Sequence, residues 1–423
     1  MNNITLPAGW FALILPLAGC VASAPVAPPA GHSGHTAAAP GKPAPMDRDT
    51  MWKNALARAP LAATAAFDPD GRLWVASVRD GHITLRHSLD LGKNFGEAVR
   101  VNPEPEFVAA DGDNRPKLAF GTRGEVYVSW TQSLETPFSG HVRFSRSLDG
   151  GRRFSVPITV NDNRAAISHR FEALGVNARG QITLAWLDKR DASAAGQRGE
   201  HYTGLAVYYA QSDDRGGSFG VNRKAADHSC ECCRIAMAMD PSGTPVIVWR
   251  HIYGRNVRDH AVLRLDGTSP PQRVAHDNWE IDACPHHGPA LSIAADGSYH
   301  VAWFTGAASR PGLFYARSTD AGQNFSAPLA VGNAQAQAGR PQVLSIGDNV
   351  WLAWKELDGR NAVLRVQHSL DGGRSWGAPS TLAQTSGASD HPLLIHHGQR
   401  VYASWFSAAE GQRVLEVPAN SSP

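Results

Sequence analysis

An eight-residue element recurs along this chain and limits its fold to a repeat architecture. The element reads Ser-x-Asp-x-Gly-x-x-aromatic, and its copies begin at Ser88, Ser147, Ser212, Ser318 and Ser369. The interval between the third and fourth copies is about twice the others, and Leu265-Asp266-Gly267 lies midway as a degenerate sixth copy. So specific a pattern indicates that one supersecondary unit is used repeatedly.

A second repeated element is a short segment of alternating apolar and polar residues that usually ends in Trp. Its copies are Leu73 to Val78, Val126 to Trp130, Ile182 to Trp186, Val246 to Trp249, His300 to Trp303, Val350 to Trp354 and Val401 to Trp405. Alternation of period two, bounded by Gly and Asp turns, predicts β-strands. The copies recur about every 54 residues, which suits one four-stranded blade per unit.

The predicted fold is therefore all-β, a β-propeller of four-stranded antiparallel blades, with seven blades favoured over six. In the second unit the strands are expected at Arg115 to Phe120, Glu125 to Trp130, His141 to Ser147 and Ile158 to Val160. The last unit stops after its third strand, Arg413 to Val417. Closure of the ring would then need an outer strand from the N-terminal side, at Met51 to Leu61.

The boxes resemble those of the sialidase superfamily, the bacterial neuraminidase repeat proteins, over about residues 60 to 417. The resemblance implies that each box is a folding device at the blade periphery, where its Ser and Asp bond the amides of a tight turn. No chemistry is therefore assigned to Asp90, Asp149, Asp214, Asp320 and Asp371. Cys230-x-Cys232-Cys233 and Trp279-x-Ile281-x-x-Cys284-Pro285-x-x-Gly288-Pro289 also resemble a Cys-x-Cys-Cys-containing subgroup of exported sialidase-like proteins.

Residues 1–20 are predicted to be a lipoprotein signal peptide. The segment Leu6 to Gly19 is mostly apolar and too short to span a bilayer. Leu17-Ala18-Gly19-Cys20 resembles a bacterial lipobox, which implies lipidation of Cys20. No Lys or Arg precedes it, so an ordinary cleaved signal stays open as the alternative.

The rest of the chain divides into a tether and a folded body. Residues 21–50 are rich in Ala, Pro and Gly and predict a disordered tether, and residues 51–420 form the propeller. Val21 fits the bacterial rule for sorting to the outer membrane. We expect a cell-envelope lipoprotein, anchored by lipid in the outer membrane and facing the periplasm or the cell surface.

The charge balance excludes one class of partner. Forty basic and 38 acidic side chains nearly cancel, and no long basic run is present, which argues against a nucleic-acid surface. We expect a monomer whose partner is a glycan or a small anionic ligand.

The segments that enter the inner strands are unusually polar and predict a site around the central channel. Four of these segments carry an arginine: Arg115, Arg170, Arg234 and Arg340. Equivalent positions in successive blades converge, and clustered guanidinium groups bind a carboxylate through bidentate, charge-assisted bonds. Sialidases resemble this arrangement in using three arginines for the sugar carboxylate. Pairing of each arginine with a neighbouring acid or carbonyl is the alternative.

The remaining sialidase machinery is matched only in part. Asp188 and Asp191 follow Trp186 in a loop where the family carries its catalytic acid, so either is a candidate for that role. The family's Arg-Ile-Pro motif is absent, and its tyrosine nucleophile has no clear counterpart, with Tyr202 and Tyr253 as candidates. If the chain is an enzyme, the resemblance implies a glycoside hydrolase of exo-α-sialidase type that requires no cofactor.

Four cysteines after Cys20 predict either disulfides or a metal site. Cys230, Cys232, Cys233 and Cys284 fall in the entry segments of two adjacent blades, so they are expected to lie close together. At least one bridge from Cys284 to the Cys230–Cys233 segment is expected. His286 and His287 lie in the same region, and thiolate with imidazole suits copper or zinc.

Three functions therefore stand side by side. The leading one is sialidase-like action on, or binding to, an acidic glycan of sialic-acid type at the channel mouth. Its rival is a non-enzymatic periplasmic protein that binds copper through the Cys and His segments. A scaffold of the cell envelope is the third, because a propeller fold does not fix a function.

Overall fold

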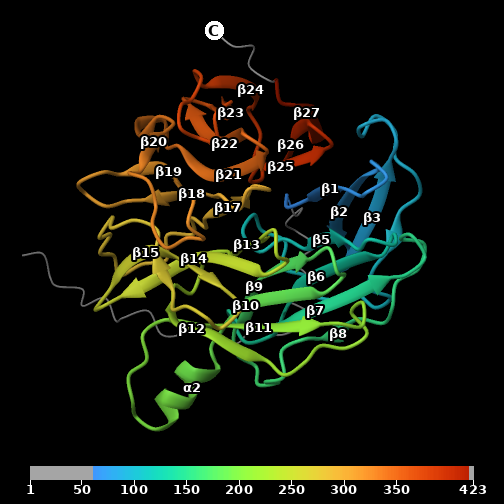
Figure 1. The fold of residues 1–423 in the computed structure, drawn as a ribbon. Coiled ribbons are helices and arrows are strands. Elements are labelled where there is room, and N and C mark those ends of the chain that lie inside the picture. The colour runs from blue at the N-terminus through green and yellow to red at the C-terminus, as the bar shows by residue number, and fades with distance from the viewer. Residues whose placement is uncertain (1–60, 419–423) are drawn as a thin grey trace, which may run out of the picture. The chain divides into compact units, whose positions relative to one another are not determined.

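The computed structural model describes residues 61–418, and nearly all of their regular structure is antiparallel β-sheet. In chain order these strands form seven units of three or four strands, which are the blades of a β-propeller (Figure 1). The third and fourth units are joined into one eight-stranded sheet through the pairing of Ser229 with His251.

The strands of the first four blades follow the order of the chain. The first blade comprises β1 (Thr64–Phe67), β2 (Leu73–Arg79), β3 (His82–Ser88) and β4 (Val99–Arg100). The second comprises β5 (Lys117–Phe120), β6 (Val126–Ser133), β7 (Gly140–Ser147) and β8 (Ile158–Thr159). The third comprises β9 (His169–Val176), β10 (Ile182–Asp188), helix α2 (Arg190–Gln197), β11 (Leu205–Ser212) and β12 (Arg223–Ser229). The fourth comprises β13 (Ala236–Met239), β14 (Pro245–Tyr253), β15 (Val257–Arg264) and β16 (Gln272–Arg273).

The last three blades continue in the same way. The fifth comprises β17 (Ala290–Ile293), β18 (Tyr299–Thr305), β19 (Gly312–Ser318) and β20 (Leu329–Val331). The 3₁₀ helix η1 (Ala334–Ala336) precedes the sixth, which comprises β21 (Gly339–Ile346), β22 (Asn349–Asp358), β23 (Asn361–Ser369) and β24 (Ser380–Thr385). The seventh comprises β25 (Leu393–His397), β26 (Arg400–Ser407) and β27 (Gly411–Glu416).

The alternating segments form the second strand of every blade. Each contributes one fully buried indole: Trp74, Trp130, Trp186, Trp249, Trp303, Trp354 and Trp405. Seven apolar clusters of the described residues each join two successive blades, and the last joins the seventh blade back to the first through Ile395, Tyr402 and Leu73. The prediction of an all-β propeller is confirmed, and the unbroken sequence of interfaces counts seven blades.

The Asp boxes are tight turns between the third and fourth strands. In the first box the Ser88 hydroxyl donates to Asp90 Oδ1 at 2.7 Å and accepts the Gly92 amide at 2.8 Å. Asp90 Oδ1 also accepts the Asn94 amide at 2.8 Å. These side chains thus satisfy the backbone donors of the turn, as the resemblance implied.

Some predictions fall on residues outside the described part of the chain. These are the signal peptide with Cys20, the tether, and nearly all of the closing strand expected at residues 51–61. Among residues 61–418, no helix is long and apolar enough to cross a membrane.

Candidate functional site

A cavity of about 810 Å³ lies where the inner strands of six blades begin. Its charged and polar lining includes Asp111, Asp113, Arg170, Lys189, Glu231, Cys232, Cys284, His286, Arg340 and His391. The structure therefore brings together five of the residues singled out from the sequence, namely Arg170, Arg340, Cys232, Cys284 and His286. The segments that enter the inner strands converge because the blades are arranged around one axis.

Several lining residues hold strained backbone conformations. Phe138, Phe171, His286 and Arg340 all have φ between 52° and 62°, the left-handed region that side chains larger than glycine seldom adopt. Such conformations cost of order 1–3 kcal/mol each and persist where the surrounding structure imposes them, often at binding sites. Their concentration around one cavity sets this region apart from the blade cores.

Arg170 and Arg340 line the cavity with guanidinium groups that lack hydrogen-bond partners. Arg170 lies with its guanidinium carbon 5.0 Å from the Phe171 ring centroid, and its Nε is buried and unpaired. Arg340 Nη1 is likewise unpaired, 3.8 Å from Asp113 Oδ2. Burial lowers the pKa of both guanidinium groups, and neighbouring acids, Asp113 for Arg340 and Asp111 for Arg170, oppose that shift. Within residues 61–418, these two arginines retain donor capacity for a ligand.

The other two predicted arginines have their donors engaged within the protein. Arg115 is buried and donates to Asp390 Oδ1 at 2.9 Å, to Ala63 O at 2.7 Å, and to two further carbonyl oxygens. Arg234 donates to Asp113 Oδ1 at 2.7 Å and to the carbonyl oxygens of Pro289 and Pro341. These contacts match the alternative interpretation, in which an arginine pairs with a neighbouring acid or carbonyl.

Asp113 balances the positive charge beside the cavity. It is buried and contacts Arg234, Arg340 and His391, whose Nδ1 lies 3.2 Å from Asp113 Oδ1. Burial opposes its ionisation, but the charge of Arg234, followed by a hydrogen bond with His391 and the charge of Arg340, holds the pKa of Asp113 well below its usual range. Burial lowers the pKa of His391 to about 4, so its imidazole is neutral at neutral pH. No role was predicted for either residue from the sequence, although His391 lies in one of the polar entry segments and Asp113 directly precedes another.

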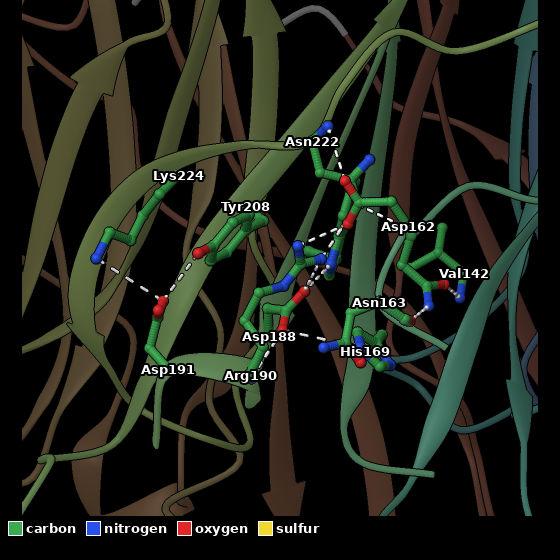
Figure 2. Close-up of polar contacts among 12 residues, drawn as sticks. Val142, Asp162, Asn163, His169, Asp188, Arg190, Asp191, Tyr208, Asn222 and Lys224 are labelled. Atoms are coloured by element: carbon green, nitrogen blue, oxygen red, sulfur yellow. Dashed lines mark hydrogen bonds and ion pairs between the residues drawn. The ribbon is translucent and has the colours of Figure 1, made fainter. Parts of the chain in front are cut away.

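The candidate acids Asp188 and Asp191 (Figure 2) are not among the residues that line the cavity, although the neighbouring Lys189 and Ser193 are. Asp188, at the end of β10, is fully buried and accepts from Trp186 Nε1, from the Arg190 amide and from Arg190 Nη2, at 2.8 to 2.9 Å. Asp191, in the first turn of α2, accepts the Tyr208 hydroxyl at 3.0 Å. Their assignment as the catalytic acid stays a prediction, and the contacts of Asp188 are those of a structural ion pair.

The candidate nucleophiles also lie outside the cavity lining. The Tyr202 hydroxyl donates to Asp227 at 2.5 Å, and burial together with that carboxylate raises the pKa of Tyr202. Burial raises the pKa of Tyr253 to about 12, and the guanidinium of Arg273 lies over its ring. Neither environment favours a phenolate at neutral pH.

The cysteines of the first segment form a compact buried cluster. The Sγ atoms of Cys230, Cys232 and Cys233 lie 3.7 to 4.0 Å apart, in the loop between β12 and β13. Cys284 is exposed, and all four cysteines are free thiols in the structure. The expected bridge from Cys284 to this cluster therefore stays a prediction.

The two histidines of the second segment have different surroundings. His286 lines the cavity, whereas His287 stacks on Phe304 with ring centroids 4.1 Å apart. Burial lowers the pKa of His287 to about 3.

Comparison with known proteins identifies the fold. No protein-family model and no curated protein matches the sequence. Among solved structures, the chain is similar to a PL25 ulvan lyase bound to -[GlcA(1-4)Rha3S]-, with a TM-score of 0.54, 11% identity, and coverage of 85% of this chain and 92% of that chain. The polysaccharide lyase Uly1 gives a TM-score of 0.51 at 10% identity, with 85% and 89% covered. The Hadza microbial sialidase Hz136 matches at a TM-score of 0.47 and 14% identity, with 80% and 74% covered. The likeness to the two lyases shows that this chain has the β-propeller fold of those proteins.

Proposed function

We propose that this propeller binds an acidic glycan in the cavity, with Arg170 and Arg340 holding a sugar carboxylate. The observation that carries the proposal is that two guanidinium groups, from the third and sixth blades, line the cavity without hydrogen-bond partners among the described residues. Buried polar groups in folded proteins nearly always have a partner, so unpaired donors beside a cavity favour an anionic ligand. A carboxylate accepts bidentate bonds from arginine.

The dimensions and charges of the cavity agree with a sugar ligand. A volume of about 810 Å³ lies within the usual range for small-molecule sites. Lys189 adds a third cation to the lining, while Asp111, Asp113 and Glu231 supply acceptors for sugar hydroxyls. The PL25 lyase, whose fold this chain shares, was solved with a ligand that contains GlcA, which makes a uronic acid a reasonable first probe beside sialic acid.

Binding is the form of the proposal that the contacts support best. A retaining sialidase would need a nucleophile at the sugar, and no tyrosine lines the cavity within residues 61–418. Cleavage of an α-sialoside or of a uronate-containing polysaccharide is therefore a second outcome to be measured beside binding.

Calorimetric titration with sialyllactose and with a glucuronate oligosaccharide tests the proposal. We expect binding to one of them that weakens with added salt. Arg170→Gln and Arg340→Gln should each weaken it about 10- to 100-fold, because each removes a charge-assisted hydrogen-bond donor. Arg152→Gln is the matched control, since Arg152 is exposed in an Asp box away from the cavity. Unchanged affinity in the folded double variant, or no binding of either glycan, would contradict the proposal.

A further inference from the structure

The loop 230–235, which connects β12 to β13, brings three sulfur atoms into a nearly equilateral triangle. The separations are 3.7 Å for Cys230 and Cys232, 4.0 Å for Cys230 and Cys233, and 3.9 Å for Cys232 and Cys233. A point in their plane equidistant from all three lies about 2.2 Å from each sulfur, close to a metal–thiolate bond length. If the three side chains only filled the core, their sulfurs would not have to surround one point at the length of a metal–sulfur bond.

A second observation favours negative charge on the sulfur of Cys230. The Arg258 guanidinium donates Nη1–H to Cys230 Sγ at 3.2 Å, although Arg258 is only 9% exposed. Arg250 is fully buried nearby, and its carbonyl oxygen accepts the Cys230 amide at 2.9 Å. A buried guanidinium commonly has an anionic partner, and here the partner that Arg258 contacts is sulfur rather than a carboxylate. Thiolate is the form of cysteine that binds metals.

The cluster also has a route from solvent. All three residues are at most 5% exposed, but Cys232 borders the cavity described above, together with Cys284. An ion can therefore reach the triangle from the cavity without unfolding of the blade. A buried site with an entry path is what a bound metal requires.

We propose that Cys230, Cys232 and Cys233 bind one Cu(I) ion through their three sulfurs. Thiolate ligands select soft ions, and Cu(I) accepts three of them in a plane. A structural zinc ion would require a fourth ligand to complete a tetrahedron, and the zinc ion itself would then lie out of the plane of the three sulfurs. Three thiolates and one monovalent cation together carry a net negative charge, which the guanidinium groups of Arg250 and Arg258 offset. The site uses neither Arg170 nor Arg340, although Cys232 borders the same cavity.

The test is titration of the reduced full chain with Cu(I) in competition with bicinchoninate, under anaerobic conditions. We expect uptake of one equivalent, with an ultraviolet thiolate-to-copper band, and X-ray absorption showing three sulfur neighbours at about 2.2 Å. Cys230→Ser and Cys233→Ser should lower the affinity at least 100-fold. Cys284→Ser is the matched control and should retain one equivalent at nearly unchanged affinity. If a buried serine prevents folding of a variant, the X-ray absorption measurement on the unaltered chain still gives the number of sulfur ligands on copper.

Several results would overturn the proposal. One is no uptake of Cu(I) by the reduced chain beyond that of the triple serine variant. Another is loss of binding in Cys284→Ser as large as in Cys233→Ser, or four sulfur neighbours, either of which would indicate a tetrahedral site. Zinc that stays bound in the presence of excess Cu(I) would also exclude it. The glycan titrations do not depend on this site, so failure here leaves them interpretable.

Discussion

Asp188 illustrates how burial separates a structural acid from a catalytic one. Its carboxylate is fully buried and forms an ion pair with Arg190 at 2.8 Å, and Arg190 also reaches Asp162 (Figure 2). Asp188→Asn would leave the guanidinium without its buried partner. We expect a loss of about 3 kcal/mol in the free energy of unfolding, measured by urea denaturation.

Asp191 provides the comparison for this prediction. Its side chain is 28% exposed, and its ion pair with Lys224 is 3.8 Å long, so Asp191→Asn should cost less than about 1 kcal/mol. Equal stability losses in the two variants would show that the buried ion pair of Asp188 with Arg190 contributes no more to the free energy of unfolding than the exposed pair does. If a glycosidase activity is found, its survival in a folded Asp188→Asn variant would remove this residue as the acid.

At the residue scale, the sequence predicted which segments would converge but not which of their side chains would be free. Arg115 and Arg170 occupy comparable entry segments, yet the first is engaged by Asp390 and Ala63, far away in the sequence. Such pairing depends on the contacts between blades, which no local pattern records. No role was predicted for Asp113 for the same reason, because its importance comes from two arginines and a histidine contributed by other blades.

At the scale of the element, the box glycine of three blades packs against an aromatic ring of the preceding blade. Gly151 has φ of +83°, and a Cβ added there would lie 2.4 Å from the Trp74 ring. Gly216 has the same relation to Phe144, as does Gly373 to Tyr315. The box is therefore also part of the interface between blades, beyond its role in the turn.

Two neighbouring glycines allow this contact to be measured separately from backbone strain. Gly150 has φ of +75°, but a Cβ added there would meet nothing within 4 Å. Gly150→Ala should cost only the strain of the left-handed conformation, about 1–2 kcal/mol. Gly151→Ala should cost at least about 2 kcal/mol more, because the buried Trp74 indole must move. Equal unfolding free energies for the two variants would show that the ring adjusts without cost.

Much of the element scale could be predicted from the sequence, because its signals are local. The strands expected in the second blade agree with β5 to β8 to within a few residues, and each alternating segment became the second strand of a blade. The cysteine segments likewise precede β13 and β17 as expected. Helix α2 was not predicted, since the eight residues Arg190–Gln197 include Gly196 and Ser193 and show no long apolar periodicity.

At the scale of the whole molecule, polar contacts supplement the apolar interface that closes the ring. Asp390, which precedes the seventh blade, accepts the Ala63 amide of the first blade at 3.2 Å and pairs with Arg115 of the second. The Asp390 carboxylate, the Arg115 guanidinium and the Ala63 amide, from three blades, thus satisfy one another where the seventh blade contacts the first. An open ring would leave these groups, and the cluster around Ile395 and Tyr402, exposed to water.

Buried and half-buried histidines make the stability of the whole propeller dependent on pH. Burial lowers the pKa to about 4 in His141, His251, His300 and His391. In the unfolded chain each imidazole has a pKa of about 6.5, so between about pH 6.5 and 4 the unfolded state binds more protons. Stability should therefore be complete above that interval and decline as the pH falls through it. The box acids Asp90 and Asp214, whose pKa is lowered to about 2 chiefly by backbone hydrogen bonds, stay ionised throughout it.

Urea denaturation at a series of pH values from about 7.5 to 4.5 measures this dependence. We expect the free energy of unfolding to decrease on acidification across this range. His300→Gln should make the decrease shallower, because it removes one titrating group whose Nδ1 lies 2.7 Å from the Tyr315 hydroxyl. A free energy of unfolding that is flat or rises as the pH falls would show that these imidazoles take up protons in the folded state. The propeller would then have to open locally to admit those protons, since His300 is only 1% exposed.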